Sequence, residues 1–147
     1  MSDTRLYLIT PATFDLTDFS AQLKEALEGG DVASVQLRMK GHYDEEIIEA
    51  AKTLMPICHA KNVAFIINDR PDIARKVGAD GVHIGQEDMS YSEARSIVGD
   101  NQIIGVTAKN SRHIAMTAGE QGADYVAFGA FYPTTTKETT IRANPEI

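Results

Sequence analysis

Short apolar runs alternate with amphipathic segments along nearly the whole chain, and this alternation limits the possible folds more than any other feature. The apolar runs are short enough to be buried strands, and apolar residues between them recur at helical spacing. A regular order of strand and helix requires parallel pairing, since each helix carries the chain back to the start of the next strand. The sequence therefore predicts an α/β fold. The expected strands fall at residues 6–9, 32–38, 64–67, 81–84, 103–106 and 125–128.

Residues typical of helix ends lie between these runs. Asp18 is expected to cap the first helix, whose apolar residues then recur four apart. Ser90 and Glu93 have the spacing of a capping box at the fourth helix. Asn110 or Ser111 is expected to cap the fifth.

A weak internal repeat favours one α/β architecture over another. The segment GADGVHIG at residues 78–85 resembles GADYVAFG at residues 122–129, two strand–helix units later. Such spacing is typical of a (β/α)8 barrel, of which about six units are present, in one domain over residues 1–147. A doubly wound sheet is the alternative, but it usually has a glycine-rich turn after the first strand, where this chain has TPAT at residues 10–13.

Composition excludes several classes of partner. The chain has 147 residues and a net charge of -7, which argues against nucleic-acid binding and against an anionic membrane surface. It has no apolar stretch long enough to span a membrane, no signal-peptide pattern and a single cysteine, so we expect a cytoplasmic protein. An anionic small molecule would need local cations or a metal ion to bind here.

Polar side chains stand at the predicted strand ends, where parallel α/β folds gather their functional groups. Gln36 and Arg38 share one face of the second strand, with Lys40 just beyond, whereas the alternate residues are apolar. Three polar groups on an inner strand face are costly to bury unless a polar ligand or water meets them. The alternative is a solvated strand end with an ion pair.

Carboxylates follow the third and fourth strands. Asp69 comes directly after an apolar strand, where it can bind a metal or cap the helix that Pro71 indicates. Asp88 lies in the loop after the fourth strand and has an adjacent carboxylate, Glu87, so the pair can also be ordinary surface charge. Because these loops are neighbours in a parallel sheet, Asp69 and Asp88 together predict a Mg²⁺ site for a phosphate-bearing substrate.

The last two strand ends carry hydroxyls and a lysine. Thr107 ends the fifth strand, and Thr134, Thr136 and Lys137 follow the sixth, which is typical of a phosphate-binding loop but also of ordinary loops. The histidines lack metal-ligand spacing, so His83 is expected to be a packed residue. Tyr125 is likewise expected to serve the core.

Taken in order, these strand-end motifs resemble those of the thiamine-phosphate synthases over nearly the whole chain. The motifs are VQLRMK at residues 35–40, INDR at 67–70, GADGVHIGQED at 78–88 and PTTTK at 133–137. The resemblance implies a (β/α)8 barrel that joins 4-amino-5-hydroxymethyl-2-methylpyrimidine diphosphate to thiazole phosphate, giving thiamine phosphate and diphosphate with Mg²⁺ as cofactor. It implies small-molecule substrates and permits a homo-oligomer.

The resemblance also implies residue roles. Asp69 and Asp88 would hold Mg²⁺. Arg38 and Lys137 would be the catalytic cations at the leaving diphosphate. The implied substrate-binding residues are Gln36, Arg38, Lys40, Asn68, Thr107, Thr134, Thr136 and Lys137.

Two departures from the family pattern leave alternatives open. Residues 108–110 are AKN, where many relatives have a histidine. A sibling thiazole tautomerase of the same fold is one alternative, but the resemblance implies that its activity needs a histidine in this loop. A non-catalytic phosphate-binding relative is the third possibility. Family members also continue through two further strands that complete the thiazole-phosphate site, so we expect these residues to belong to a longer polypeptide and to lack coupling activity by themselves.

Overall fold

The computed structural model describes residues 3–136 and 141–147, which alternate strictly between strand and helix. Every expected strand is present, and most are bounded within a residue of the sequence prediction; the fifth runs three residues further than expected. The elements are β1 (Leu6–Ile9), α1 (Leu16–Gly29), β2 (Val32–Leu37), α2 (Asp44–His59), β3 (Ala64–Asn68), α3 (Pro71–Val77), β4 (Gly81–Ile84), α4 (Tyr91–Val98), β5 (Ile103–Lys109), α5 (Arg112–Gln121) and β6 (Tyr125–Phe128).

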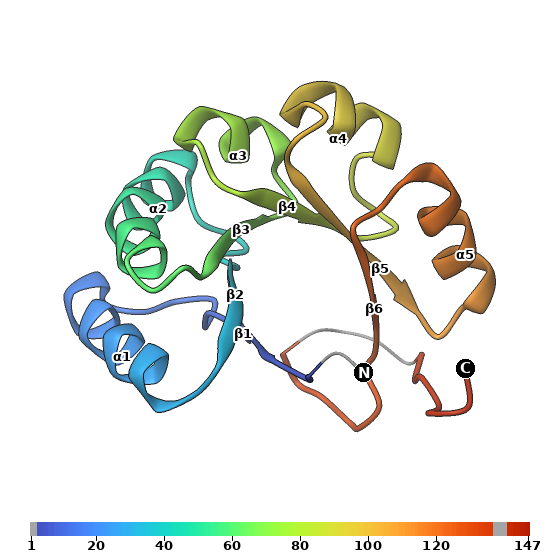
Figure 1. Ribbon diagram of the computed structural model, residues 1–147, viewed down its shortest axis with the longest axis horizontal. Coiled ribbons are helices and arrows are strands. Elements are labelled where there is room, and N and C mark those ends of the chain that lie inside the picture. Colours follow the sequence, from blue (N-terminus) through green and yellow to red (C-terminus); the bar gives the residue numbers. More distant parts are fainter. Residues whose placement is uncertain (1–2, 137–140) are drawn as a thin grey trace.

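The strands form a single parallel sheet whose spatial order follows the sequence, β1-β2-β3-β4-β5-β6. The sheet curls into an arc, and the helices cover its convex outer face (Figure 1). Within the described residues, β1 and β6 are the two ends of this arc, and the segment after β6 lies at its open side. The predicted parallel α/β fold is confirmed as a curled half-barrel.

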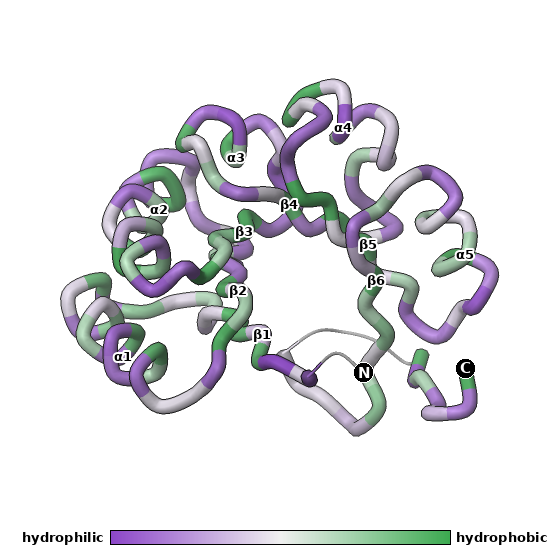
Figure 2. The backbone as a smooth tube through the Cα atoms, viewed as in Figure 1, coloured by the Kyte–Doolittle hydropathy of each residue, from purple (hydrophilic) through white to green (hydrophobic). Residues whose placement is uncertain are grey.

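Alternation along each strand divides the side chains between two environments. Val35 and Leu37 of β2 point outward into the apolar layer beneath the helices and are each 1% exposed. Gln36, between them, lies on the concave face. Apolar residues concentrate along the strands and polar residues on the outer helical surface, as Figure 2 shows. Apolar burial between sheet and helices therefore stabilises the arc and leaves its concave face free for polar groups.

The internal repeat has a structural purpose at the amino end of the sheet. Asp80 accepts a hydrogen bond from the backbone N–H of Phe65 at 2.7 Å, and Asp124 accepts one from the N–H of Ile104 at 2.8 Å. Each Gly-Ala-Asp copy thus satisfies a backbone donor near the start of a preceding strand. His59 also contacts Asp80, with 2.7 Å between Nε2 and Oδ2.

The helix starts confirm two of the expected caps and correct one. Ser90 and Glu93 form the predicted capping box, and Ser111 caps α5. The expectation for Asp18 is wrong, because α1 begins earlier and Asp15 accepts the N–H of Asp18 at 2.9 Å. Both aspartates precede the same apolar pattern, so spacing alone does not separate them. No helix in the described ranges combines the length and apolarity needed to cross a membrane.

Candidate active site

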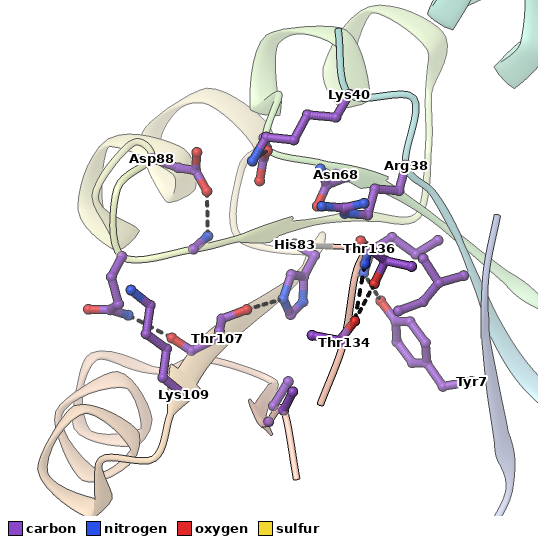
Figure 3. Close-up of a pocket in the computed structure, with 18 of the residues that line it drawn as sticks. Tyr7, Arg38, Lys40, Asn68, His83, Asp88, Thr107, Lys109, Thr134 and Thr136 are labelled. Carbon is purple, nitrogen blue, oxygen red and sulfur yellow. Dashed lines mark hydrogen bonds and ion pairs between the residues drawn. The ribbon is translucent and has the colours of Figure 1, made fainter. Parts of the chain in front are cut away.

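A cavity of about 930 Å³ lies on the concave side, at the carboxyl ends of the strands. Its volume is suited to small-molecule substrates, for which sites of roughly 300–1,000 Å³ are usual. Every predicted site residue that the structure describes lines this one cavity, and Figure 3 shows how several of them converge. These residues are Gln36, Arg38, Lys40, Asn68, Asp69, Asp88, Thr107, Thr134 and Thr136. Lys137 lies outside the described residues.

Within the described residues, three carboxylates line the cavity, and two of them, Asp69 and Asp88, interact with each other. Burial of the Asp69 carboxyl and, next, the neighbouring Asp88 raise the pKa of Asp69, while Lys40 opposes the shift. The Lys40 ammonium lies 3.6 Å from Asp69 Oδ2, a long contact for an ion pair. Like charges held this close favour either a shared proton or a bound cation.

The backbone holds Asp69 in an uncommon conformation. Its φ is +63°, in the left-handed region that residues other than glycine rarely adopt. The next residue, Arg70, bonds to Asp44 of α2 at 2.6 and 2.9 Å and to Asp72 of α3 at 2.9 and 2.7 Å. Arg70 therefore ties the loop to two helices. The alternative role of Asp69 as a helix cap is wrong, because Arg70, not Asp69, occupies the N-cap position of α3.

The donor set fits a magnesium ion better than a metal held wholly by protein. Among residues 3–136 and 141–147, no cluster of three or more metal-ligating side chains occurs. Mg²⁺ is commonly bound through one or two carboxylates, with waters and substrate phosphates completing the shell. Asp88 is oriented for this by the backbone N–H of Gly85, which donates to its Oδ2 at 2.7 Å. Asp69 and Asp88 would hold such an ion.

Two cationic side chains at the end of β2, Arg38 and Lys40, line the cavity. Arg38 lines the cavity and has no ion pair with any residue that the structure describes. Among residues 3–136 and 141–147, the one ion pair of Lys40 is its long contact to Asp69. An arginine of this kind is suited to bidentate binding of a phosphate or diphosphate.

A chain of side-chain hydrogen bonds crosses the floor of the cavity. Gln36 Nε2 donates to the Tyr7 hydroxyl at 2.9 Å, and the Tyr7 and Tyr125 hydroxyls share a bond of 2.7 Å. His83 lies 2.9 Å from the Tyr125 hydroxyl through Nδ1 and 2.7 Å from Thr107 Oγ1 through Nε2. We call these five residues the hydroxyl–imidazole chain. It connects the inner faces of β1, β2, β4, β5 and β6.

One glycine makes this chain possible. Gly105 of β5 lies in register between His83 and Tyr125, on the strands to either side. A Cβ on Gly105 would lie 1.9 Å from the Tyr125 ring, so only glycine lets that ring cross β5 to reach His83. The rings of His83 and Tyr125 then stack with centroids 5.6 Å apart.

Sequence reasoning missed Tyr7, His83 and Tyr125 as cavity residues. His83 is buried, as expected of a packed residue, and Tyr125 lies in strand β6; both also line the cavity and bond to each other within it. The signal was available, since each stands on the inward position of its strand, as Gln36 does. Burial, the largest cause for both phenols, raises the pKa of Tyr7 and of Tyr125, so both hydroxyls keep their protons at neutral pH.

Comparison with known proteins agrees with this geometry. Residues 6–147 match the family model described as thiamine monophosphate synthase. The chain is 59% identical over its whole length to the thiamine-phosphate synthase of Rhodospirillum centenum, and covers 71% of that protein. The chain belongs to the thiamine monophosphate synthase family. The family assignment stated from the motifs is thereby confirmed.

Two further family comparisons support the assignment. The thiamine-phosphate synthase of Hyphomonas neptunium is 52% identical over 98% of the chain, which covers 67% of that relative. A solved structure, thiamine phosphate pyrophosphorylase from Pyrococcus furiosus, superposes with a TM-score of 0.77 at 35% identity. That match covers 90% of this chain and 63% of the solved one. Sequence and fold therefore point to the same family.

Proposed function

We propose that the protein that contains these residues joins 4-amino-5-hydroxymethyl-2-methylpyrimidine diphosphate to thiazole phosphate, forming thiamine phosphate and diphosphate with Mg²⁺. One observation carries the proposal. The adjacent carboxylates Asp69 and Asp88 share a cavity with several hydroxyls and with Arg38, a cation that forms no ion pair within the described part of the chain. A diphosphate needs this combination of metal ligands and cations, and family membership supplies the substrate class.

The proposed reaction depends mainly on stabilising the charges that develop on the leaving diphosphate and on the pyrimidinylmethyl group. The bond between the pyrimidinylmethyl carbon and the diphosphate oxygen breaks, its electrons leave with the diphosphate, and the aminopyrimidine ring stabilises the resulting cation. The lone pair of the thiazole nitrogen then forms the new carbon–nitrogen bond. Bound Mg²⁺ would neutralise charge on the departing diphosphate. Arg38 and Lys40 stabilise the same charge from the β2 side, with Lys137 proposed opposite.

The remaining cavity residues orient the substrates. Asn68 and Gln36 are proposed to contact the pyrimidine diphosphate, and Thr134 and Thr136 the thiazole phosphate. Thr134 and Thr136 bond to each other at 2.8 Å, so the loop already presents its hydroxyls together. Thr107 is seated by His83 and faces the cavity. Holding the thiazole nitrogen in line with the cleaving bond accounts for part of the rate enhancement.

A coupling assay tests this function. The protein is incubated with both substrates, with and without Mg²⁺, and thiamine phosphate is measured. We expect product only when Mg²⁺ is present, and a large loss in Asp88→Ala. Asp31→Asn is the matched control, since Asp31 is an exposed carboxylate paired with Arg5 away from the cavity.

The same assay separates the alternatives. Isomerised thiazole without thiamine phosphate would indicate the sibling tautomerase. Ligand binding without any turnover would indicate a phosphate-binding relative. Product formation at full rate without divalent metal would contradict the role given to Asp69 and Asp88.

Two further statements belong to the proposal. The curl of the sheet and its unbroken parallel order support an arc of a (β/α)8 barrel. A cytoplasmic location is expected from composition, and fractionation of cells would test it. The family resemblance permits a homo-oligomer, which light scattering would detect.

A further inference from the structure

The end of β5 is irregular at a residue for which sequence reasoning gave no role. Pairing with β6 shifts register between Thr107 and Lys109, so β5 has a bulge there. Lys109 itself has a φ of +54°, and the N–H of Gly129 donates to its carbonyl at 3.0 Å. Bulges near sites commonly redirect a side chain, and left-handed residues other than glycine concentrate at functional positions.

The side chain of Lys109 lines the cavity and is only 25% exposed. Its Nζ lies 3.2 Å from Glu87 Oε1, in the loop after β4. Glu87 is 82% exposed, and water screens an ion pair with such a partner. An incoming multivalent anion can therefore displace Glu87 from Lys109 at little cost.

Strand order places Lys109 in a symmetric arrangement of charge. Along the carboxyl end of the sheet, β2, β3, β4 and β5 supply Lys40, Asp69, Asp88 and Lys109 in turn. The two carboxylates are thus flanked by one lysine on each side. Figure 3 shows the two lysines entering the cavity from different sides.

We propose that Lys109 is a further diphosphate-binding residue, placed on the β5 side of the carboxylate pair as Lys40 is placed on the β2 side. Glu87 holds the ammonium group near the cavity until the anion arrives. The inference rests on the proposed function for the identity of the anion. It assigns to this chain a cation that the strand-end motifs did not include.

Binding of inorganic diphosphate in the presence of Mg²⁺ tests the proposal by calorimetry, independently of turnover. Lys109→Met is expected to weaken diphosphate affinity about tenfold, the scale of one charge-assisted contact, and to raise the KM of the diphosphate substrate more than it lowers kcat. Lys109→Arg is expected to restore most of the affinity. Lys61→Met is the matched control, because it removes an equal charge and breaks a Lys–Glu pair, with Glu28, outside the cavity.

A second variant tests the part given to Glu87. Glu87→Gln should strengthen diphosphate binding when Lys109 is present and lose that gain in the Lys109→Met background. Equal diphosphate affinity of the Lys109→Met and Lys61→Met variants would overturn the binding role of Lys109. If Glu87→Gln strengthened diphosphate binding equally with Lys109 present and with Lys109→Met, the role given to Glu87 would be overturned. A wild-type protein that binds diphosphate but forms no thiamine phosphate would refute the proposed function while leaving the Lys109 contact measurable.

Discussion

Charged residues at the two ends of the sheet differ in how their side chains are partnered. At the amino end, Asp80 and Asp124 are each matched by a backbone N–H and by a side chain, His59 and Arg95 respectively. At the carboxyl end, Arg38 has no ion pair among the described residues, and burial, followed by the neighbouring Asp88, raises the pKa of Asp69.

Backbone strain follows the same division. Two of the three described residues other than glycine with positive φ, Asp69 and Lys109, line the cavity at the carboxyl end. The third, Asn62, lies in the turn before β3 at the other end. Matched charge at the amino end stabilises the fold. At the carboxyl end, the cavity combines strained backbone with Arg38, for which the described residues provide no ion-pair partner, while Arg70 beside it is paired with Asp44 and Asp72.

The largest expected effect is on activity at the carboxyl end. Asp69→Asn should lower turnover roughly 100-fold or more, because an amide replaces an anionic metal ligand. The same change should raise the free energy of unfolding of the metal-free protein by about 0.5–2 kcal/mol, since it relieves a like-charge contact. Coupling assays and urea unfolding measure the two effects. Full activity, or a clear loss of stability, would contradict the division between the two ends.

The next effect is on stability at the amino end. Asp80→Ala should lower the free energy of unfolding by about 1–3 kcal/mol, because the N–H of Phe65 loses its acceptor. Asp124→Ala should act in the same way through Ile104, as the second copy of the repeat. Steady-state kinetics of the folded variants should match the wild type. A changed KM without lost stability would mean that this end also serves the ligand.

A smaller effect on both stability and turnover is expected in the hydroxyl–imidazole chain, which lies at the floor of the cavity. Tyr125→Phe removes the hydroxyl that joins Tyr7 to His83, so we expect about 1 kcal/mol of lost stability. Because His83 hydrogen-bonds to Thr107 in the cavity, turnover should fall roughly tenfold, at the low end of the effects of lost orienting contacts. Thermal unfolding and kcat are measured together. Unchanged kcat would restrict the hydroxyl–imidazole chain to a structural role.

The smallest effect concerns pH. The pKa of Asp69 is raised above its ordinary value of 3.8, so the folded metal-free protein binds this proton more tightly than the unfolded chain does. Ionised Asp69 therefore destabilises the fold at neutral pH. This penalty shrinks as the pH falls below the raised pKa and is gone below the ordinary value of 3.8. The stability advantage of Asp69→Asn should be largest near pH 7 and shrink toward pH 4. A constant difference over this range would contradict the assigned shift.

Much of the fold and site was predictable because both depend on local periodicity. Alternation along β2 placed Gln36 inward and Val35 outward without any tertiary information. Parallel order then brought Asp69 and Asp88 to one cavity, since the carboxyl ends of neighbouring strands share an edge. The predicted start of α1 was about one helical turn too late, because Asp15 and Asp18 have equal capping chemistry.

By itself, the sequence determined the parallel α/β order and the inward polar face, because these follow from spacing along the chain. Its strand-end motifs also carried the family resemblance. Only the tertiary structure decided which side chains meet across the cavity. The His83–Tyr125 contact exists because Gly105 leaves room over β5, and Lys109 faces the cavity at a bulge and a left-handed backbone. Such contacts depend on packing between strands, which the order of residues along one strand does not encode.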